Sequence, residues 1–212
     1  EANLLQMNQT VSIRDVVLVP HPSIAQVLRQ CQEKNQRPNV DFFREKVEDS
    51  NFLNQLQATV NRWIREIQKV TKLERDPSTG SAMQEITFWL NIERALYKIQ
   101  EQMSSPEVTL TLETLKLGKR FHATISFDSD TGLKEAMDKV KNYNLLMKDF
   151  PMHELLSAND LGKIKNSITG IFNHLKRVRN TRYPVNRIPR FIEAISRDLN
   201  TQMIKVEIVE FV

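Results

Sequence analysis

The chain has 212 residues, of which 40% are apolar and 26% charged, and its formal net charge is +4. This length suits one large domain or two small ones, and the low apolar content favours elongated helical bundles over one round core. Only five glycines occur, so phosphate-cradling loops are expected to be rare. No apolar run approaches the roughly 20 residues that span a bilayer, and the N-terminus lacks the pattern of a signal peptide.

Two features bear on the setting of the protein. The sequence does not begin with Met, so we expect it to be a fragment. The one cysteine, Cys31, cannot form an internal disulfide, which favours a reducing cytosol. Because no histidine is near it in the sequence, Cys31 is interpreted as a packing or surface thiol.

The first 22 residues, 1–22, are expected to form an extended or partly helical lead-in that lies along a bundle. Residues 11–19 are rich in β-branched side chains, and the run Pro20-His21-Pro22 argues against a helix there. Ser23 is the predicted N-cap of a helix that continues to about Asn35. The polar connector that follows is anchored by Phe42, Phe43 and Val47.

Residues 50–103 are predicted to form an antiparallel hairpin of two long amphipathic helices. Apolar residues recur in steps of three and four, the rhythm of helices that pack lengthwise on other helices. The run Asp76-Pro77-Ser78-Thr79-Gly80 between them favours a turn. The predicted structural core of the hairpin is Leu53, Leu56, Val60, Trp63, Ile67, Trp89 and Leu96.

Acidic residues of this hairpin superficially resemble paired carboxylates. Glu66, Glu85 and Glu93 are better explained by pairs at i,i+3 or i,i+4 on helix surfaces. The basic residues considered for these pairs are Arg62, Arg65 and Lys69. Trp63 and Trp89 are expected in the core rather than in a ligand cage, so no acid–base site is predicted here.

The next helix is predicted from Pro106 to Leu117, with Ser105 as its N-cap. The alternation Val-Thr-Leu-Thr-Leu at 108–112 would also suit a strand. Helix is favoured because no partner strand of similar length is nearby. Gly118-Lys119-Arg120 is interpreted as the end of this helix and not as a phosphate loop.

Three more helices are expected in the second half. One begins near Thr131 and ends before Asp149-Phe150-Pro151. Another follows the run Ser157-Ala-Asn-Asp160, which resembles a capping box. The last runs from about Val185 to Leu199, after a turn at 180–184.

The predicted fold is therefore all-α: an elongated stack of antiparallel helical bundles behind an extended N-terminal lead-in. The first bundle is expected at 23–127 and contains the central hairpin 50–103. The second is expected at 128–206, and residues 207–212 are left unassigned.

Motifs that hold metals or nucleotides are poorly represented. Asp128-Ser129-Asp130-Thr131-Gly132 opens like a calcium loop, but it lacks the acidic twelfth position and is better explained as a helix-capping turn. The histidines at 21, 122, 153 and 174 are not at helical spacing from one another, and His174 is expected to be solvated. The sequence predicts no catalytic, cofactor-binding or metal-binding residue.

The strongest charge pattern is basic and lies at 163–205. This segment has ten Lys and Arg and two acidic residues, whereas residues 1–162 carry 20 basic and 22 acidic residues. A solvated face, an acidic protein partner, and a nucleic acid or lipid partner all remain open. Sparse aromatic residues count against stacking on single strands. The candidate partner-binding residues are Lys176, Arg177, Arg179, Arg182, Arg187 and Arg190.

Several motifs resemble the N-terminal tail of the cytoplasmic dynein heavy chain. They include Lys46-Val-Glu-Asp-Ser-Asn-Phe-Leu-Asn-Gln-Leu-Gln and Asn61-Arg-Trp-Ile-Arg-Glu-Ile-Gln-Lys-Val. Glu85-Ile-Thr-Phe-Trp is similar to a signature shared across dynein heavy chain tails. Lys119-Arg-Phe-His-Ala-Thr, Met147-Lys-Asp-Phe-Pro and Glu193-Ala-Ile-Ser-Arg-Asp-Leu continue the similarity, which runs from about Ile24 to Val206. It stops at Glu207-Ile-Val-Glu-Phe-Val212.

The resemblance implies a tail segment of a minus-end-directed microtubule motor, cytoplasmic and associated with the cytoskeleton. Such tails hold two heavy chains together, lie against dynactin and cargo adaptors, and bind intermediate and light-intermediate chains, which we expect to bind outside this fragment. The ATPase ring of the family is distant from the tail, so the fragment is expected to be non-catalytic. The basic segment is our hypothesis for the dynactin or adaptor contact. Charge reversal of Arg177, Arg179 and Arg182 should then weaken assembly.

Overall fold

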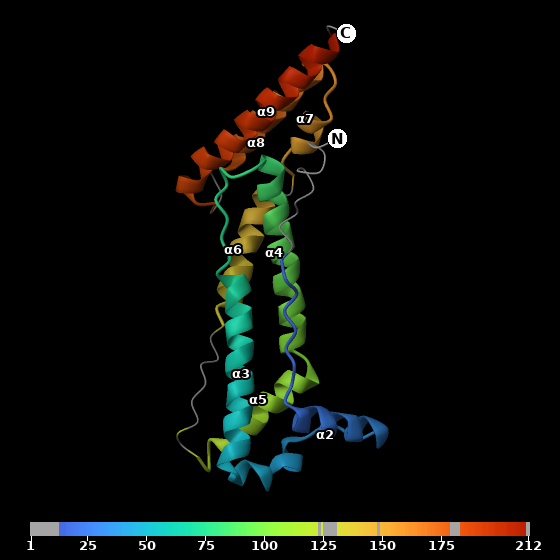
Figure 1. Ribbon diagram of the computed structural model, residues 1–212, viewed down its shortest axis with the longest axis vertical. Coiled ribbons are helices and arrows are strands. Elements are labelled where there is room, and N and C mark those ends of the chain that lie inside the picture. Colours follow the sequence, from blue (N-terminus) through green and yellow to red (C-terminus); the bar gives the residue numbers. More distant parts are fainter. Residues whose placement is uncertain (1–12, 123, 125–130, 148, 179–182, 211–212) are drawn as a thin grey trace. The chain divides into compact units, whose positions relative to one another are not determined.

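Helices are the only regular structure in the computed structural model, which describes residues 13–122, 124, 131–147, 149–178 and 183–210 (Figure 1). The α-helices are α2 (Pro22–Glu33), α3 (Ser50–Thr71), α4 (Ala82–Met103), α5 (Pro106–Gly118), α6 (Leu133–Met147), α7 (Met152–Leu156), α8 (Leu161–Val178) and α9 (Ile188–Glu210). Short 3₁₀ turns occur at η1 (Val40–Phe43), η2 (Lys46–Glu48) and η3 (Val185–Arg187). The predicted all-α fold is confirmed.

Packing divides the described chain into two compact units. The first contains the described parts of 1–13, 73–94 and 137–212, and the second contains those of 14–72 and 95–136. Helices α4 and α6 each contribute residues to both units. The predicted bundle boundary after residue 127 stays a prediction, because residues 125–130 lie outside the described part of the chain.

The two long helices expected at 50–103 are present as α3 and α4, separated by a turn at 72–81. Their apolar seams supply much of the buried side-chain volume, which stabilises the helices through burial rather than through propensity. The seven residues predicted as the structural core are all buried: Leu53, Leu56, Val60, Trp63, Ile67, Trp89 and Leu96.

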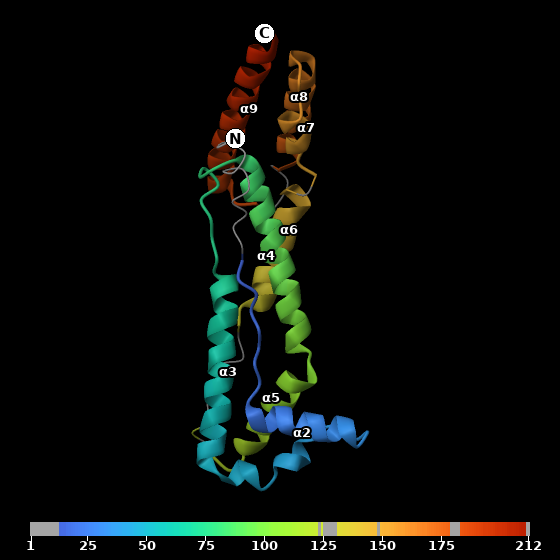
Figure 2. The same cartoon turned by 45° about the vertical axis from the view of Figure 1, so that its right-hand side comes forward.

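In the second unit, the described part of the lead-in lies between α3 and the C-terminal part of α4 (Figures 1 and 2). The indole Nε1 of Trp63 donates to the carbonyl of Val19 at 2.9 Å. The side-chain amide of Gln102 accepts from the backbone N–H of Leu18 at 2.9 Å and donates to the carbonyl of Val16 at 2.8 Å. Side chains from two helices therefore satisfy backbone groups that an extended segment cannot satisfy by itself.

Helix α2 begins one residue after His21, so the prediction that Ser23 is its N-cap is wrong. The Nδ1 atom of His21 accepts from the backbone N–H of Ser23 at 3.2 Å, and Pro22 occupies the first helical position. Proline is tolerated there because that N–H has no intrahelical partner in any helix. The Phe52 ring lies edge-on to His21 at 5.7 Å. Cys31 is buried in the same helix.

The anchors expected in the connector between α2 and α3 differ in burial. Phe43 and Val47 are completely buried, and Phe43 stacks on Phe52 with ring centroids 5.9 Å apart. Phe42 is half exposed. The 3₁₀ turn η1 gives neighbouring residues different directions, so two adjacent phenylalanines cannot both face the core.

Helix rather than strand is confirmed for α5. The Ser105 hydroxyl accepts from the backbone N–H of Val108, and Pro106 is the first residue of the helix. The threonines that made a strand conceivable are accommodated inside the helix. The buried hydroxyls of Thr111 and Thr114 each donate at 2.7 Å to the carbonyl four residues earlier, which removes the cost of an unpaired polar group.

The last residue of α5 is glycine for reasons of space. A Cβ atom at Gly118 would lie 2.4 Å from Cδ2 of Leu53 in α3. Real carbon atoms do not approach so closely without displacement, and Leu53 is fully buried. Gly118 therefore permits the close approach of α5 and α3 in the second unit.

Two details of the first unit correct the sequence-based expectations. The N-cap of α8 is Asp160 and not Ser157: Asp160 Oδ1 accepts from the backbone N–H of Lys163 at 2.8 Å, and this bond lowers the pKa of Asp160. His174 is buried rather than solvated. Its Nε2 is hydrogen-bonded to the carbonyl of Leu146, and its ring lies edge-on to Phe150 at 4.9 Å. Its basic sequence neighbours occupy other faces of α8.

We predict that Gln102→Ala releases the lead-in, because both of its bonds to Val16 and Leu18 are lost. Amide hydrogen exchange at 16–19 should accelerate, and stability should fall by about 1–2 kcal/mol. Gln100→Ala is the matched control, since Gln100 is exposed two residues earlier on the same helix. Equal exchange in the two variants would contradict the role given to Gln102.

Candidate functional site

A buried carboxylate organises the first unit. Glu85, near the start of α4, is fully buried. Its Oε1 accepts from the Trp89 indole Nε1 at 2.6 Å and from the Tyr183 hydroxyl at 3.3 Å. The guanidinium of Arg187 lies 2.8 Å from the same oxygen, and Arg75 lies 3.2 Å from Oε2. The carboxylate therefore has two cationic and two neutral donors, which together offset the cost of burying its charge.

The prediction that Glu85 pairs along a helix surface is wrong. Its basic partners are 10 and 102 residues away in the sequence, a separation that no helical spacing reveals. The same prediction is confirmed for Glu66, which pairs with Lys69 three residues later at 2.6 Å. Glu93 differs from both, since its Oε2 accepts from the side-chain amide of Asn144 at 2.8 Å.

Aromatic rings enclose the ion pairs around Glu85. The guanidinium of Arg187 lies 5.2 Å from the Trp89 ring centroid, within the range of a cation–π contact. Tyr143 lies edge-on to Trp89 at 4.8 Å and to Tyr183 at 5.0 Å. Burial and the nearby Glu85 charge raise the pKa of Tyr183, so its phenol stays protonated and can donate. Burial is the largest single effect on the pKa of Arg187 and lowers it, but the hydrogen bonds and charges of Glu85 and Tyr183 together outweigh burial and raise this pKa.

The turn between α3 and α4 is held by the η3–α9 segment within the first unit. Arg187 makes several of these contacts: besides its bond to Glu85, it donates to the carbonyl of Arg75 at 2.8 Å and pairs with Glu74 at 3.1 Å. Three further contacts follow along α9: Arg190 to Asp76 at 3.0 Å, Arg197 to the Gly80 carbonyl at 3.0 Å, and the backbone N–H of Ala82 to Asp198 at 2.9 Å. The last contact caps the N-terminus of α4 from another helix.

The six basic residues predicted to bind a partner are therefore in different surroundings. The Arg187 side chain is only 14% exposed and is engaged with Glu74 and Glu85, and Arg190 is exposed but paired. Lys176 and Arg177 are exposed on α8, with no ion pair to any described residue. Arg179 and Arg182 lie outside the described residues.

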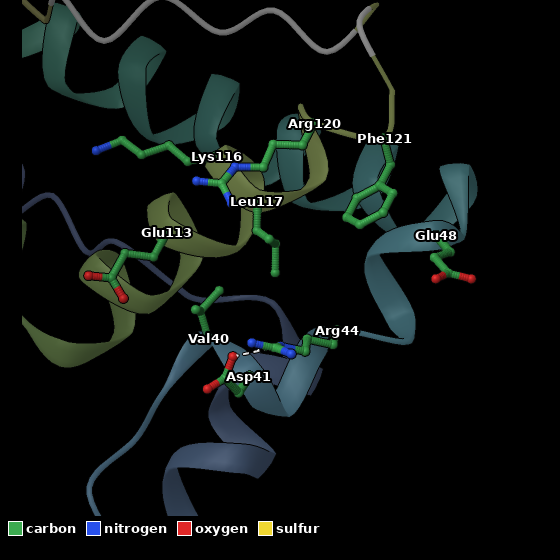
Figure 3. Close-up of a pocket in the computed structure, with 9 residues that line it drawn as sticks. All are labelled: Val40, Asp41, Arg44, Glu48, Glu113, Lys116, Leu117, Arg120 and Phe121. Atoms are coloured by element: carbon green, nitrogen blue, oxygen red, sulfur yellow. Dashed lines mark hydrogen bonds and ion pairs between the residues drawn. The ribbon is translucent and has the colours of Figure 1, made fainter.

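A hollow of about 580 Å³ lies in the second unit, between η1 and the C-terminal part of α5 (Figure 3). Val40 and Leu117 point towards each other across it, while Arg44 pairs with Asp41 at 2.8 Å. The other charged residues that line it are Glu48, Glu113, Lys116 and Arg120. Positive and negative charges balance, and the lining offers no nucleophile next to a base.

Neither a metal site nor a membrane-spanning helix is found among the described residues. No group of three or more His, Cys, Asp or Glu side chains in this part of the chain is placed to hold a metal ion. The calcium-like run at 128–132 lies mostly outside the described residues. Of the helices described, none combines the length and apolar character needed to cross a membrane.

Comparison with known proteins identifies the family. Residues 53–209 match the family model described as dynein heavy chain, N-terminal region 1. The chain belongs to the dynein heavy chain family. It is 58% identical over 206 residues to "Dynein heavy chain, cytoplasmic" of Drosophila melanogaster and 52% identical over 206 residues to the protein of that name in Caenorhabditis elegans. Both alignments cover 97% of this chain and 4% of the relative. A Dictyostelium discoideum relative is 41% identical, with 97% and 4% covered.

This match confirms the resemblance found in the sequence, and the matched region is the N-terminal tail region of dynein heavy chains. The chain spans about 4% of the length of these relatives. The run Glu85-Ile-Thr-Phe-Trp89, on which part of that resemblance was based, has a physical explanation. It places a carboxylate and an indole N–H one helical turn apart, and the two groups are hydrogen-bonded in the buried cluster.

We predict that Glu85→Gln strongly destabilises the first unit, because Arg75 and Arg187 lose their buried counter-ion. The expected cost is about 3–5 kcal/mol, measured by urea unfolding and by hydrogen exchange of amides 85–94. Glu66→Gln removes an exposed pair and should leave the free energy of unfolding almost unchanged. If the two variants proved equally stable, Glu85 would not be the centre of this unit.

Asp198 gives a prediction with a pH dependence. Burial raises the pKa of its carboxyl, so the stability it contributes is complete below its unfolded pKa and is lost as pH rises through the higher folded value. Asp198→Asn keeps an oxygen for the Ala82 N–H and should match or exceed the wild type at pH 7. Asp198→Ala should lose about 1 kcal/mol.

The measurement is thermal or urea unfolding of Asp198→Asn and wild type between pH 4 and pH 7. Lowering the pH should favour the wild type relative to Asp198→Asn, because only the wild-type carboxyl takes up a proton. A difference that is independent of pH, or that changes in the opposite direction, would contradict the raised pKa.

Proposed function

We propose that this chain is a non-catalytic tail segment of a cytoplasmic dynein heavy chain. It serves as a helical scaffold in minus-end-directed microtubule transport, in the cytoplasm and associated with the cytoskeleton. The observation that carries the proposal is the match of residues 53–209 to the N-terminal region of dynein heavy chains. The relatives named cytoplasmic dynein heavy chains support the location.

A mechanical role suits the way the residues are used. Charged and aromatic side chains that could have formed a reactive site are engaged with one another around Glu85. Buried ion pairs of this kind fix the geometry of helices more than they add net stability. In this proposal, ATP hydrolysis belongs to another part of the motor, and the tail segment holds partner-binding faces at fixed spacing.

The proposed partners are a second dynein heavy chain, dynactin and cargo adaptors. Intermediate and light-intermediate chains would bind outside this segment. The proposed contact with dynactin or an adaptor is the basic segment 163–205, and the exposure of Lys176 and Arg177 on α8 supports it. Arg187 and Arg190 would contribute mainly by holding the turn before α4, because their charges are already paired.

The second candidate is a helical protein- or nucleic-acid-binding module that uses the same segment. Its net charge of plus eight favours this alternative. Binding to oligonucleotides that is strong and falls steeply with salt would support it. The dynein family membership and the scarcity of aromatic residues on this segment favour the tail scaffold instead.

We predict that Lys176→Glu with Arg177→Glu weakens assembly of the motor with dynactin and an adaptor, because exposed cations steer and orient an acidic partner. The loss should be about tenfold at physiological salt, measured by single-molecule co-localisation of the intact motor with dynactin. Thermal unfolding should be unchanged.

The control is Lys119→Glu with Arg120→Glu. Lys119 and Arg120 are also an adjacent, exposed basic pair, but they lie just after the end of α5 in the second unit. Assembly should be retained in this variant. Equal loss in both variants would indicate a general charge effect and would reject the specific contact on α8.

A further inference from the structure

Helix α8 has an apolar stripe that its own unit leaves partly uncovered. Its core-facing side is made by Ile164, Ser167, Ile171 and His174, all buried. Next to this buried side runs a second row of apolar residues, which are seven, four and three positions apart in the sequence: Leu161, Ile168, Phe172 and Leu175. Phe172 is 61% exposed and Leu161 is 45% exposed. Residues with this spacing share one face of a helix.

Cations border this stripe on its outer side. By the helical period, Lys165 and Lys176 lie next to Leu161 and Phe172, on the side away from the buried residues. Both lysines are exposed, and neither forms an ion pair with a described residue. Helix α8 contains no acidic residue, so nothing on the helix itself neutralises them.

Several other basic residues at 163–205 already have partners. Lys163 pairs with Asp160 at 3.5 Å. Arg187, Arg190 and Arg197 all bind the turn before α4. Four described cations of 163–205 are exposed and form no ion pair or side-chain hydrogen bond with a described residue: Lys165, Lys176 and Arg177 on α8, and Lys205 on α9. Most of this unpaired positive charge therefore lies on α8, beside an aromatic and aliphatic stripe.

An apolar stripe bordered by cations favours a protein helix over a nucleic acid as the partner of α8. A nucleic acid requires phosphate contacts and stacked aromatics but gains little from a leucine–isoleucine stripe. A helix with an apolar stripe and adjacent carboxylates would satisfy both halves of the surface, since apolar stripes pack lengthwise and flanking charges set partner choice.

We propose that the surface formed by Leu161, Lys165, Ile168, Phe172, Leu175 and Lys176 binds an acidic amphipathic helix of a protein partner. This inference rests on the proposed function of the basic segment and specifies the chemistry of the partner it receives. Phe172 is the apolar anchor. The two lysines fix the orientation and reject helices with basic flanks.

The test uses the 212-residue chain and two synthetic stapled helices, each about 18 residues long. Both carry a leucine stripe, flanked by Glu in one peptide and by Lys in the other. Fluorescence anisotropy should show the Glu-flanked helix binding about tenfold more tightly at low salt, with the difference shrinking at high salt. Lys165→Glu with Lys176→Glu should reverse the preference.

The apolar half of the proposal is tested by Phe172→Ser, which should weaken both peptides about fivefold or more. Tyr97→Ser is the matched control, because Tyr97 is a half-exposed aromatic on a helix elsewhere, and it should change nothing. If Phe172→Ser does not keep its circular dichroism spectrum, Leu161→Ser replaces it.

Three results would overturn the inference. These are equal affinity for the two peptides, affinity unaffected by both stripe variants, or binding of an oligonucleotide or anionic vesicles in place of the Glu-flanked helix. Apart from the 212-residue chain itself, the peptide assay contains no motor subunit, dynactin or adaptor. If assembly is unchanged by Lys176→Glu with Arg177→Glu while the wild-type chain binds peptides charge-selectively, the proposed function is contradicted and this inference stands. If assembly is weakened but the chain shows no preference between the peptides, this inference is contradicted.

Discussion

The first unit depends on one buried carboxylate. Glu85 joins its own helix, through Trp89, to the turn that precedes it, through Arg75, and to the segment before α9, through Arg187 and Tyr183. A buried ion of this kind is costly unless every donor is in place. Because the donors come from segments about a hundred residues apart, the cluster forms only when those segments are assembled correctly, and so it specifies a single arrangement.

The second unit is held together by different means. There, backbone groups of an extended segment are satisfied by side chains of two helices, and the indole of Trp63 and the amide of Gln102 make the decisive bonds. Each tryptophan of the chain thus uses its N–H to fix a non-helical or charged group within an apolar seam. The apolar steps of three and four supply burial, and a few polar groups determine which elements meet.

Local patterns predicted the helices well and the polar contacts poorly. Helix caps and apolar periods depend on residues within one or two turns, so they can be recognised in the sequence. Examples are the cap formed by Ser105 with Pro106 and the apolar periods of α3, α4, α6 and α8. The pairing of Glu85 depends on partners far along the chain. One clue was present: an acidic residue one turn before a tryptophan on an apolar face is placed for burial. The prediction that His174 is solvated was wrong for a similar reason. Its basic neighbours in the sequence are not its neighbours in space, where it contacts Leu146 and Phe150.

The cap on α4 has a consequence for synthesis of the chain. The backbone N–H of Ala82 is bound by Asp198, 116 residues later. A ribosome must therefore complete most of this sequence before Asp198 can bind this N–H, and the loop that must close is long. Until then Glu85 also lacks two of its donors, Tyr183 and Arg187, which are synthesised about a hundred residues later. The first turn of α4 also has a local capping box, because Ser81 Oγ accepts from the Gln84 N–H and Gln84 Oε1 accepts from the Ser81 N–H. Synthesis of the last helix therefore adds the partner of one further N–H, that of Ala82, to a turn that can form earlier.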